Sequence, residues 1–158
     1  MQLNKFFSIK QFLFILILFF LDFFSKKIIF NNIRLNEFIT IMPFLDFAHI
    51  HNYGISFGLF SGTISPLLIT VLGLLITSIV IYFMIKTTSV VEKWGLTLII
   101  SGAISNIFDR ALNDYVLDFI YIHFGDFYWP AFNFADIYIS IGIVLILVQF
   151  FLRGKKIK

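Results

Sequence analysis

The sequence has no cysteine and few charged residues, and each shortage excludes a class of protein. Without cysteine, the chain can form no disulfide, no thiolate nucleophile and no cysteine-ligated metal site. Charged residues make up only 13% and apolar residues 59% of the chain, and the mean hydropathy of +0.96 is too high for a soluble globular domain. The composition therefore predicts an integral membrane protein in which any nucleophile is an oxygen.

Four apolar segments are long enough to cross a membrane as helices. The first follows two lysines, as a signal peptide would, but no small-residue cleavage site follows it, so we expect it to be retained. Pro66 suits the first turn of the second helix. We predict one integral membrane domain over residues 1–158, with spans at about 11–30, 66–85, 93–109 and 136–152.

The charges are distributed unevenly between the two sides that these spans define. The side with both termini holds eight of the twelve basic residues and only one of the nine acids, Glu92. Cytoplasmic segments of membrane proteins are enriched in lysine and arginine. The distribution therefore predicts that both termini are cytoplasmic and that the other side is external.

Two segments on the external side, 31–65 and 109–135, are too long to be simple turns. Residues 44–60 partly alternate between apolar and polar side chains and contain glycines, a pattern that favours short strands. The predicted fold class is an all-α membrane protein with four transmembrane helices and a small extracytoplasmic β-sheet resting on the bilayer.

Asp118 and Asp136 stand out because each lies in an apolar stretch beside a predicted span. A carboxylate near hydrocarbon is costly without a partner or a function. Two carboxyls in one site cannot both ionise easily, so one can activate water while the other stays protonated and polarises a carbonyl. The alternative for Asp136 is structural, because Asn133 lies three residues before it, as in a helix-capping pair.

Other charged residues near the ends of the spans have ordinary structural interpretations as well. Asp22 and Lys26 are four residues apart, which favours an ion pair on one helical face. Asp109 and Arg110 favour an interfacial ion pair, although a guanidinium there could also hold a lipid phosphate or a substrate carbonyl.

The segment HNYGISFG and the histidines have both structural and functional interpretations. Asn52, Gly54 and Gly58 could form a turn, or the glycines could admit a peptide substrate to which the Asn52 amide binds. Histidine spacing matches no compact zinc motif, so we expect solvated or structural roles for all three: His49, His51 and His123.

Five blocks of sequence, in order, resemble the signature blocks of the lipoprotein signal peptidase family, also called signal peptidase II: DFFSK at 22–26, NYGISFG at 52–58, SGAISNIFDR at 101–110, VLDF at 116–119 and WPAFNFAD at 129–136. The resemblance spans nearly the whole chain. It implies a multi-pass aspartic endopeptidase of the bacterial inner membrane, with its active site at the external surface. Such an enzyme cleaves prolipoproteins on the N-terminal side of a lipidated cysteine.

The resemblance also implies roles for individual residues. Asp118 and Asp136 match the catalytic pair. Nine further positions match residues that bind substrate or support the site: Asp22, Lys26, Asn52, Gly54, Asn106, Asp109, Arg110, Asn133 and Ala135. The family further implies a short periplasmic helix, prolipoprotein and membrane lipid as partners, a monomer, and no metal, cofactor or nucleic acid.

The chain departs from the family pattern at three positions. Ser105 and Ser56 replace a glycine and an alanine, and both are small enough to be tolerated. Asp114 replaces a glycine before the VLDF block, and aspartate accepts a positive φ better than most residues.

Three other functions compete with a peptidase. A proton-conducting subunit would favour carboxylates near the bilayer centre, whereas most external acids lie in loops or at the ends of spans. A lipid phosphatase would favour clustered external histidines and arginines, but Arg34 and Arg110 are the only external arginines. A purely structural subunit leaves the apolar setting of Asp118 unexplained.

Overall fold

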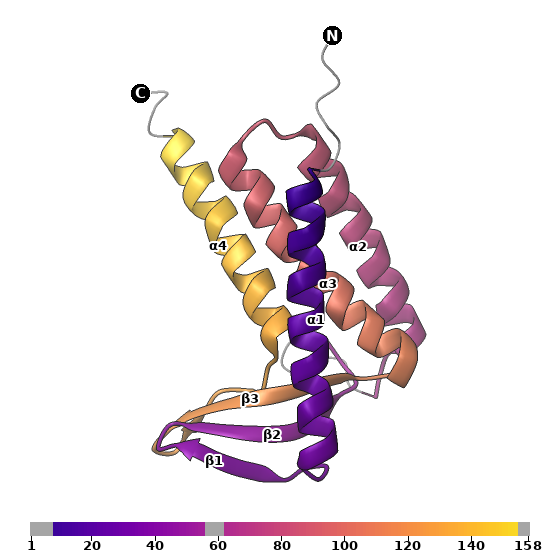
Figure 1. The fold of residues 1–158 in the computed structure, drawn as a ribbon, viewed down its shortest axis with the longest axis vertical. Coiled ribbons are helices and arrows are strands. Elements are labelled where there is room, and N and C mark those ends of the chain that lie inside the picture. The colour runs from indigo at the N-terminus through magenta and orange to yellow at the C-terminus, as the bar shows by residue number, and fades with distance from the viewer. Residues whose placement is uncertain (1–7, 56–61, 155–158) are drawn as a thin grey trace.

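A computed structural model describes residues 8–55 and 62–154, which form four helices and a four-stranded sheet (Figure 1). The helices are α1 (Ile9–Asn32), α2 (Pro66–Lys86), α3 (Val90–Asn113) and α4 (Phe134–Gly154). The strands are β1 (Phe38–Met42), β2 (Leu45–Asn52), β3 (Val116–Phe124) and β4 (Phe127–Tyr128), in the order β1-β2-β3-β4. The sheet lies across one end of the helical bundle, while α1 starts and α4 ends at the opposite end.

The four predicted apolar segments are all helical. Helix α2 begins at the predicted residue, and every other helix end lies one to four residues beyond its predicted limit. Serine side chains cap the starts of three of them, Ser8 for α1, Ser65 for α2 and Ser89 for α3. By length and hydropathy, α2 and α4 are the described helices able to cross a membrane. Helices α1 and α3 carry buried charged side chains, which lower their mean hydropathy.

Helix α3 lies at the centre of the bundle and packs against the other three helices. Its contact with α4 depends on glycine, because a Cβ atom on Gly102 would lie 2.2 Å from the carbonyl oxygen of Ala135. A Cβ atom on Gly142 would likewise lie 2.5 Å from the carbonyl oxygen of Gly95. These close approaches bring the start of α4 against α3, which is where the candidate site lies.

The small sheet predicted from residues 44–60 is present but is larger than expected. Strand β3, which the sequence did not indicate, pairs with β2 so that Asp118 lies opposite Ile50. The first five residues of β3 are buried, so the start of this strand lies inside the protein and not at its surface. The described parts of the two external segments contain no separate short helix, and residues 56–61 of the first segment lie outside the described residues.

Candidate functional site

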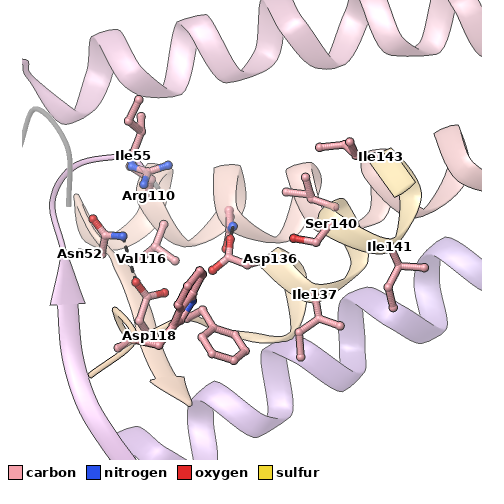
Figure 2. Close-up of a pocket in the computed structure, with 15 residues that line it drawn as sticks. Asn52, Ile55, Arg110, Val116, Asp118, Asp136, Ile137, Ser140, Ile141 and Ile143 are labelled. Atoms are coloured by element: carbon pink, nitrogen blue, oxygen red, sulfur yellow. Dashed lines mark hydrogen bonds between the residues drawn. The ribbon is translucent and has the colours of Figure 1, made fainter. Parts of the chain in front are cut away.

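A cavity of about 620 Å³ lies where β3, α3 and the start of α4 meet. Figure 2 shows the side chains of Asp118 and Asp136 directed into this cavity, one from a strand and one from a helix. Isoleucines of α4 line much of the remaining wall, including Ile137 and Ile141. The polar lining residues are Asn52, Asn106, Arg110, Asp118, Asp136 and Ser140. The fold thus brings the two aspartates selected from the sequence to one largely apolar cavity.

Asp118 is buried in β3, with 3% of its surface exposed. Its carboxyl accepts hydrogen bonds from Asn52 Nδ2 at 2.9 Å and from Asn133 Nδ2 at 2.7 Å. Burial raises the pKa of Asp118 to about 7, and the nearby charge of Asp136 adds to this increase. Asp118 can therefore hold a proton near neutral pH.

Asp136 lies in the first turn of α4, where the helix dipole favours a negative charge. It accepts hydrogen bonds from Asn106 Nδ2 at 2.9 Å and from the backbone N–H of Asn133 at 3.2 Å. In return, the Asp136 backbone N–H donates to Asn133 Oδ1 at 3.1 Å. The predicted capping pair is confirmed, and Asn133 contacts both aspartates.

Three asparagine side chains are held with Nδ2 toward an aspartate, because a group that can only donate occupies each Oδ1. The donors are the Gly54 N–H for Asn52 at 2.9 Å, the Asp136 N–H for Asn133 at 3.1 Å, and Lys26 Nζ for Asn106 at 3.1 Å. Reversing any of these amides would place a donor against a donor. The surrounding structure therefore fixes which amide atoms face the carboxyls.

Lys26 forms a second, ionic cluster next to this site. Its Nζ lies 2.6 Å from Asp22 Oδ2, as the spacing in α1 predicted, and 2.8 Å from Asp109 Oδ2 on α3. Asp22 Oδ1 accepts the backbone N–H of Ala135 at 3.0 Å, which ties α1 to the start of α4. All three charged side chains are largely buried, so the cluster depends on its internal pairing.

Arg110 does not form the ion pair with Asp109 that the sequence favoured. Successive residues of a helix point in different directions, and Asp109 turns to Lys26 instead. Arg110 Nη2 donates to the carbonyl of Gly54 at 2.7 Å, and its buried Nε has no hydrogen-bond partner among the described residues. Arg110 therefore braces the turn after β2 and lines the cavity.

A family model described as "Signal peptidase (SPase) II" matches residues 14–152. The chain belongs to the signal peptidase II family. Proteins of this family are membrane peptidases that cleave the signal peptides of prolipoproteins. Membership decides against the transporter, lipid phosphatase and structural-subunit alternatives.

Relatives and solved structures agree with this assignment. The lipoprotein signal peptidase of Wigglesworthia glossinidia brevipalpis is 37% identical over 140 residues, which cover 87% of this chain and 92% of that protein. The Pelagibacter ubique protein of the same name is 44% identical over 121 residues, covering 75% and 72%. A bacterial membrane enzyme solved by the in meso method at 2.3 Å has a TM-score of 0.88 and 25% identity, and the match covers 100% of this chain and 97% of that one.

Hydrogen bonds and ion pairs connect all eleven selected residues of this signal peptidase II in one network, in which Asn52, Asn106 and Asn133 contact the two aspartates directly. The other six are connected through these asparagines: Gly54 and Arg110 through Asn52, and Lys26, Asp22, Asp109 and Ala135 through Asn106. Asp114, which we expected to tolerate a positive φ, has a φ of 66° and follows the end of α3. Gly58 and Ser56 lie outside the described residues. The apolar wall of α4 was not predicted, although isoleucines at positions 137, 139, 141 and 143 line it and two pairs of them are one helical turn apart.

Proposed function

We propose that this signal peptidase II is an aspartic endopeptidase whose catalytic pair is Asp118 and Asp136. The observation that supports this most directly is the shared setting of the two carboxyls. They line one cavity, and asparagine amides and one backbone N–H bind them. Among the described residues, no lysine or arginine forms an ion pair with either. Two carboxyls held in this way can share one proton, as an aspartyl dyad requires.

In the proposed reaction, Asp136 is the ionised partner and Asp118 is the protonated one. Asp136 takes a proton from a water molecule, whose oxygen attacks the scissile carbonyl carbon. Asp118 meanwhile donates a hydrogen bond to the carbonyl oxygen, on which negative charge develops. The tetrahedral intermediate collapses when the C–N bond breaks and the leaving nitrogen receives a proton from the dyad.

The substrate is proposed to be a prolipoprotein whose cysteine carries a diacylglyceryl group, with cleavage on the N-terminal side of that cysteine. The isoleucine wall of α4 offers apolar surface to the signal peptide beside the carboxyls. We further propose that all four helices span the inner membrane with cytoplasmic termini. The charge asymmetry supports this orientation, which places the dyad at the external surface.

Both aspartates come from one chain, so a monomer suffices for this mechanism, and neither a metal nor a cofactor is required. Membrane lipid enters as the surroundings of the diacylglyceryl group, and nucleic acid has no part in the reaction.

The test is cleavage of a diacylglyceryl-modified lipobox peptide by purified enzyme, compared with the same peptide without the lipid. We expect only the lipidated peptide to be cut. Asp118→Asn and Asp136→Asn should each lower the rate by about 10³-fold or more while the protein stays folded. Asp126→Asn changes an exposed aspartate outside the cavity and serves as the matched control. Near-normal cleavage by either dyad variant would overturn the assignment.

A further inference from the structure

Among the described residues of α4, Ser140 is the one polar side chain that lines the cavity beyond Asp136. It follows Asp136 by four residues, so the two side chains lie on the same side of the helix (Figure 2). The other α4 residues that line the cavity after Asp136 are isoleucines: Ile137, Ile139, Ile141 and Ile143. A single hydroxyl is therefore set in the isoleucine wall, one helical turn from the proposed dyad.

The Ser140 hydroxyl differs from most hydroxyls within the helices of this protein. Serine and threonine in a helix can donate to the carbonyl oxygen four residues earlier. Ser140 forms neither this bond nor any other hydrogen bond with the described part of the chain. Six other hydroxyls within the helices do form it, at 2.7–2.9 Å: Ser25, Thr70, Thr77, Ser78, Thr97 and Ser101.

Ser105 in α3 also has a hydroxyl without a partner among the described residues, but it is enclosed. Only 3% of Ser105 is exposed, and it does not line the cavity, whereas Ser140 is exposed within it. A hydroxyl among apolar groups costs free energy unless it is hydrogen-bonded. Ser140 therefore holds a free donor at a place that a ligand in the cavity can reach.

An extended peptide substrate supplies an acceptor for this hydroxyl. Where water is scarce beside a membrane, each backbone carbonyl of a bound peptide needs a hydrogen-bond donor from the protein. The isoleucines around Ser140 have no side-chain donor. A peptide that lies along the isoleucine wall can therefore bind a backbone carbonyl to the hydroxyl of Ser140.

The position of Ser140 along α4 selects one carbonyl of the substrate. The helix rises about 6 Å from Asp136 to Ser140, at about 1.5 Å per residue. An extended peptide covers about 6.6 Å in two residues. In the proposed orientation, α4 runs from the external surface toward the cytoplasm, where the basic start of a signal peptide lies. The carbonyl beside Ser140 thus belongs to the residue two positions before the one whose carbonyl the dyad attacks.

We propose that the Ser140 hydroxyl binds substrate by donating a hydrogen bond to the backbone carbonyl of the third residue before the lipidated cysteine. This inference rests on the proposed function, because it uses the proposed cleavage site and membrane orientation. When that carbonyl is bound to Ser140, the scissile carbonyl lies beside Asp118 and Asp136. Every amino acid at that substrate position has the same carbonyl, so the contact fixes the register of the peptide and not its sequence.

Ser140→Ala removes the hydroxyl and tests its contribution to binding. Leaving a buried substrate carbonyl without its donor should weaken binding by about tenfold. We expect KM for the lipidated lipobox peptide to rise by that factor with kcat little changed, because the bond is present in both the bound substrate and the transition state. Ser78→Ala is the matched control, since Ser78 is an exposed serine of α2 whose hydroxyl donates to the carbonyl of Leu74. Its KM should equal that of the wild type.

A modified substrate identifies the partner of the hydroxyl. The amide that joins the third and second residues before the cysteine is replaced by an ester, whose carbonyl is a weaker acceptor. The ester should raise KM several-fold with the wild type. With Ser140→Ala it should change KM much less, because the hydrogen bond is already absent and the two changes are not additive.

An unchanged KM in Ser140→Ala, an effect confined to kcat, or equal sensitivity of both enzymes to the ester would each overturn the proposal. Cleavage by Asp118→Asn would instead overturn the dyad. The ratio of KM between Ser140→Ala and the wild type would still decide the role of Ser140 in that case.

Discussion

The two pairs of buried aspartates lie side by side in this protein but are satisfied in different ways. Asp22 and Asp109 share the ammonium group of Lys26 at 2.6 and 2.8 Å. Asp118 and Asp136 receive amide and backbone N–H donors instead. A full positive charge strongly stabilises the ionised form of a carboxyl. Neutral N–H donors stabilise that form less, so a buried carboxyl bound by them can keep its proton more easily. The comparison shows that one fold can hold two aspartates as ionised partners of a lysine and hold two others without a direct ion pair, so that they can exchange a proton.

Asn106 connects the two pairs. Its Oδ1 accepts from Lys26 at 3.1 Å, and its Nδ2 donates to Asp136 at 2.9 Å. Lys26 therefore forms ion pairs with Asp22 and Asp109, whereas it acts on the other pair by orienting the Asn106 amide and, from a greater distance, through its charge.

The largest expected effect comes from removing the ammonium group. Lys26→Met should leave Asp22 and Asp109 buried without a cation, and breaking such a pair typically destabilises a protein by about 3–5 kcal/mol. Thermal unfolding in detergent measures this change. Lys27→Met alters the exposed neighbour and should leave the midpoint almost unchanged. Equal midpoints for the two variants would mean that Lys26 does not brace the bundle.

Cutting the link between the pairs should affect activity more than stability. Asn106→Ala removes a donor that positions Asp136, and because a positioned acid or base contributes about 10²–10⁴-fold to the rate, we expect kcat to fall by about 10²-fold. Cleavage assays should show the loss mainly in kcat, with KM little changed. Asn113→Ala, at an exposed position near the end of α3, is the control. A KM effect alone would assign Asn106 to substrate binding instead.

The two pairs should also respond differently to pH. Because the pKa of Asp118 is raised to about 7, the folded state binds its proton more tightly than the unfolded state does. That contribution to stability is complete below the unfolded pKa, near 4, and is lost as the pH rises through about 7. Asp118→Asn should therefore become more stable relative to the wild type as the pH rises, by roughly a few degrees in Tm.

Thermal unfolding of Asp118→Asn and wild type from pH 4 to 9 checks this dependence. In the wild type, kcat/KM should also fall above about pH 7 as Asp118 loses its proton. If the Tm of Asp118→Asn stays constant or falls relative to that of the wild type as the pH rises, the pKa of Asp118 is not raised.

The smallest effect is expected from an ion pair far from both aspartate pairs. Arg153 Nη1 lies 2.6 Å from Glu92 Oε1 at the opposite end of the bundle, and the arginine side chain is 52% exposed. Exposed ion pairs contribute about 0–1 kcal/mol, so Arg153→Gln should change the unfolding midpoint little and cleavage not at all. If Arg153→Gln lowered the unfolding midpoint as much as Lys26→Met does, burial would not explain why one ion pair stabilises the protein more than the other.

Local sequence signals predicted much of this structure. The Asn133 and Asp136 capping pair, the Asp22 and Lys26 pair and the positive φ of Asp114 all depend on residues within one helical turn or at a single position. Hydropathy alone located the four helices, because long apolar runs have few other stable conformations.

Contacts between distant segments could not be predicted in the same way. The partner of Asp109 lies on another helix, and β3 becomes a strand because β2 pairs with it. Contacts between residues of different helices or strands depend on how these elements pack. The periodic pattern of apolar residues in the sequence does not specify that packing.

The hydrogen bond between Asp22 and the N–H of Ala135 has a consequence for biogenesis. It joins residues 113 positions apart, so α1 leaves the ribosome well before α4 and carries an acceptor for it. Asp136, which directly follows Ala135, can reach Asn106 only after the final helix has been inserted. The contacts of Asp136 therefore form only after α4 has been synthesised and has packed against α3.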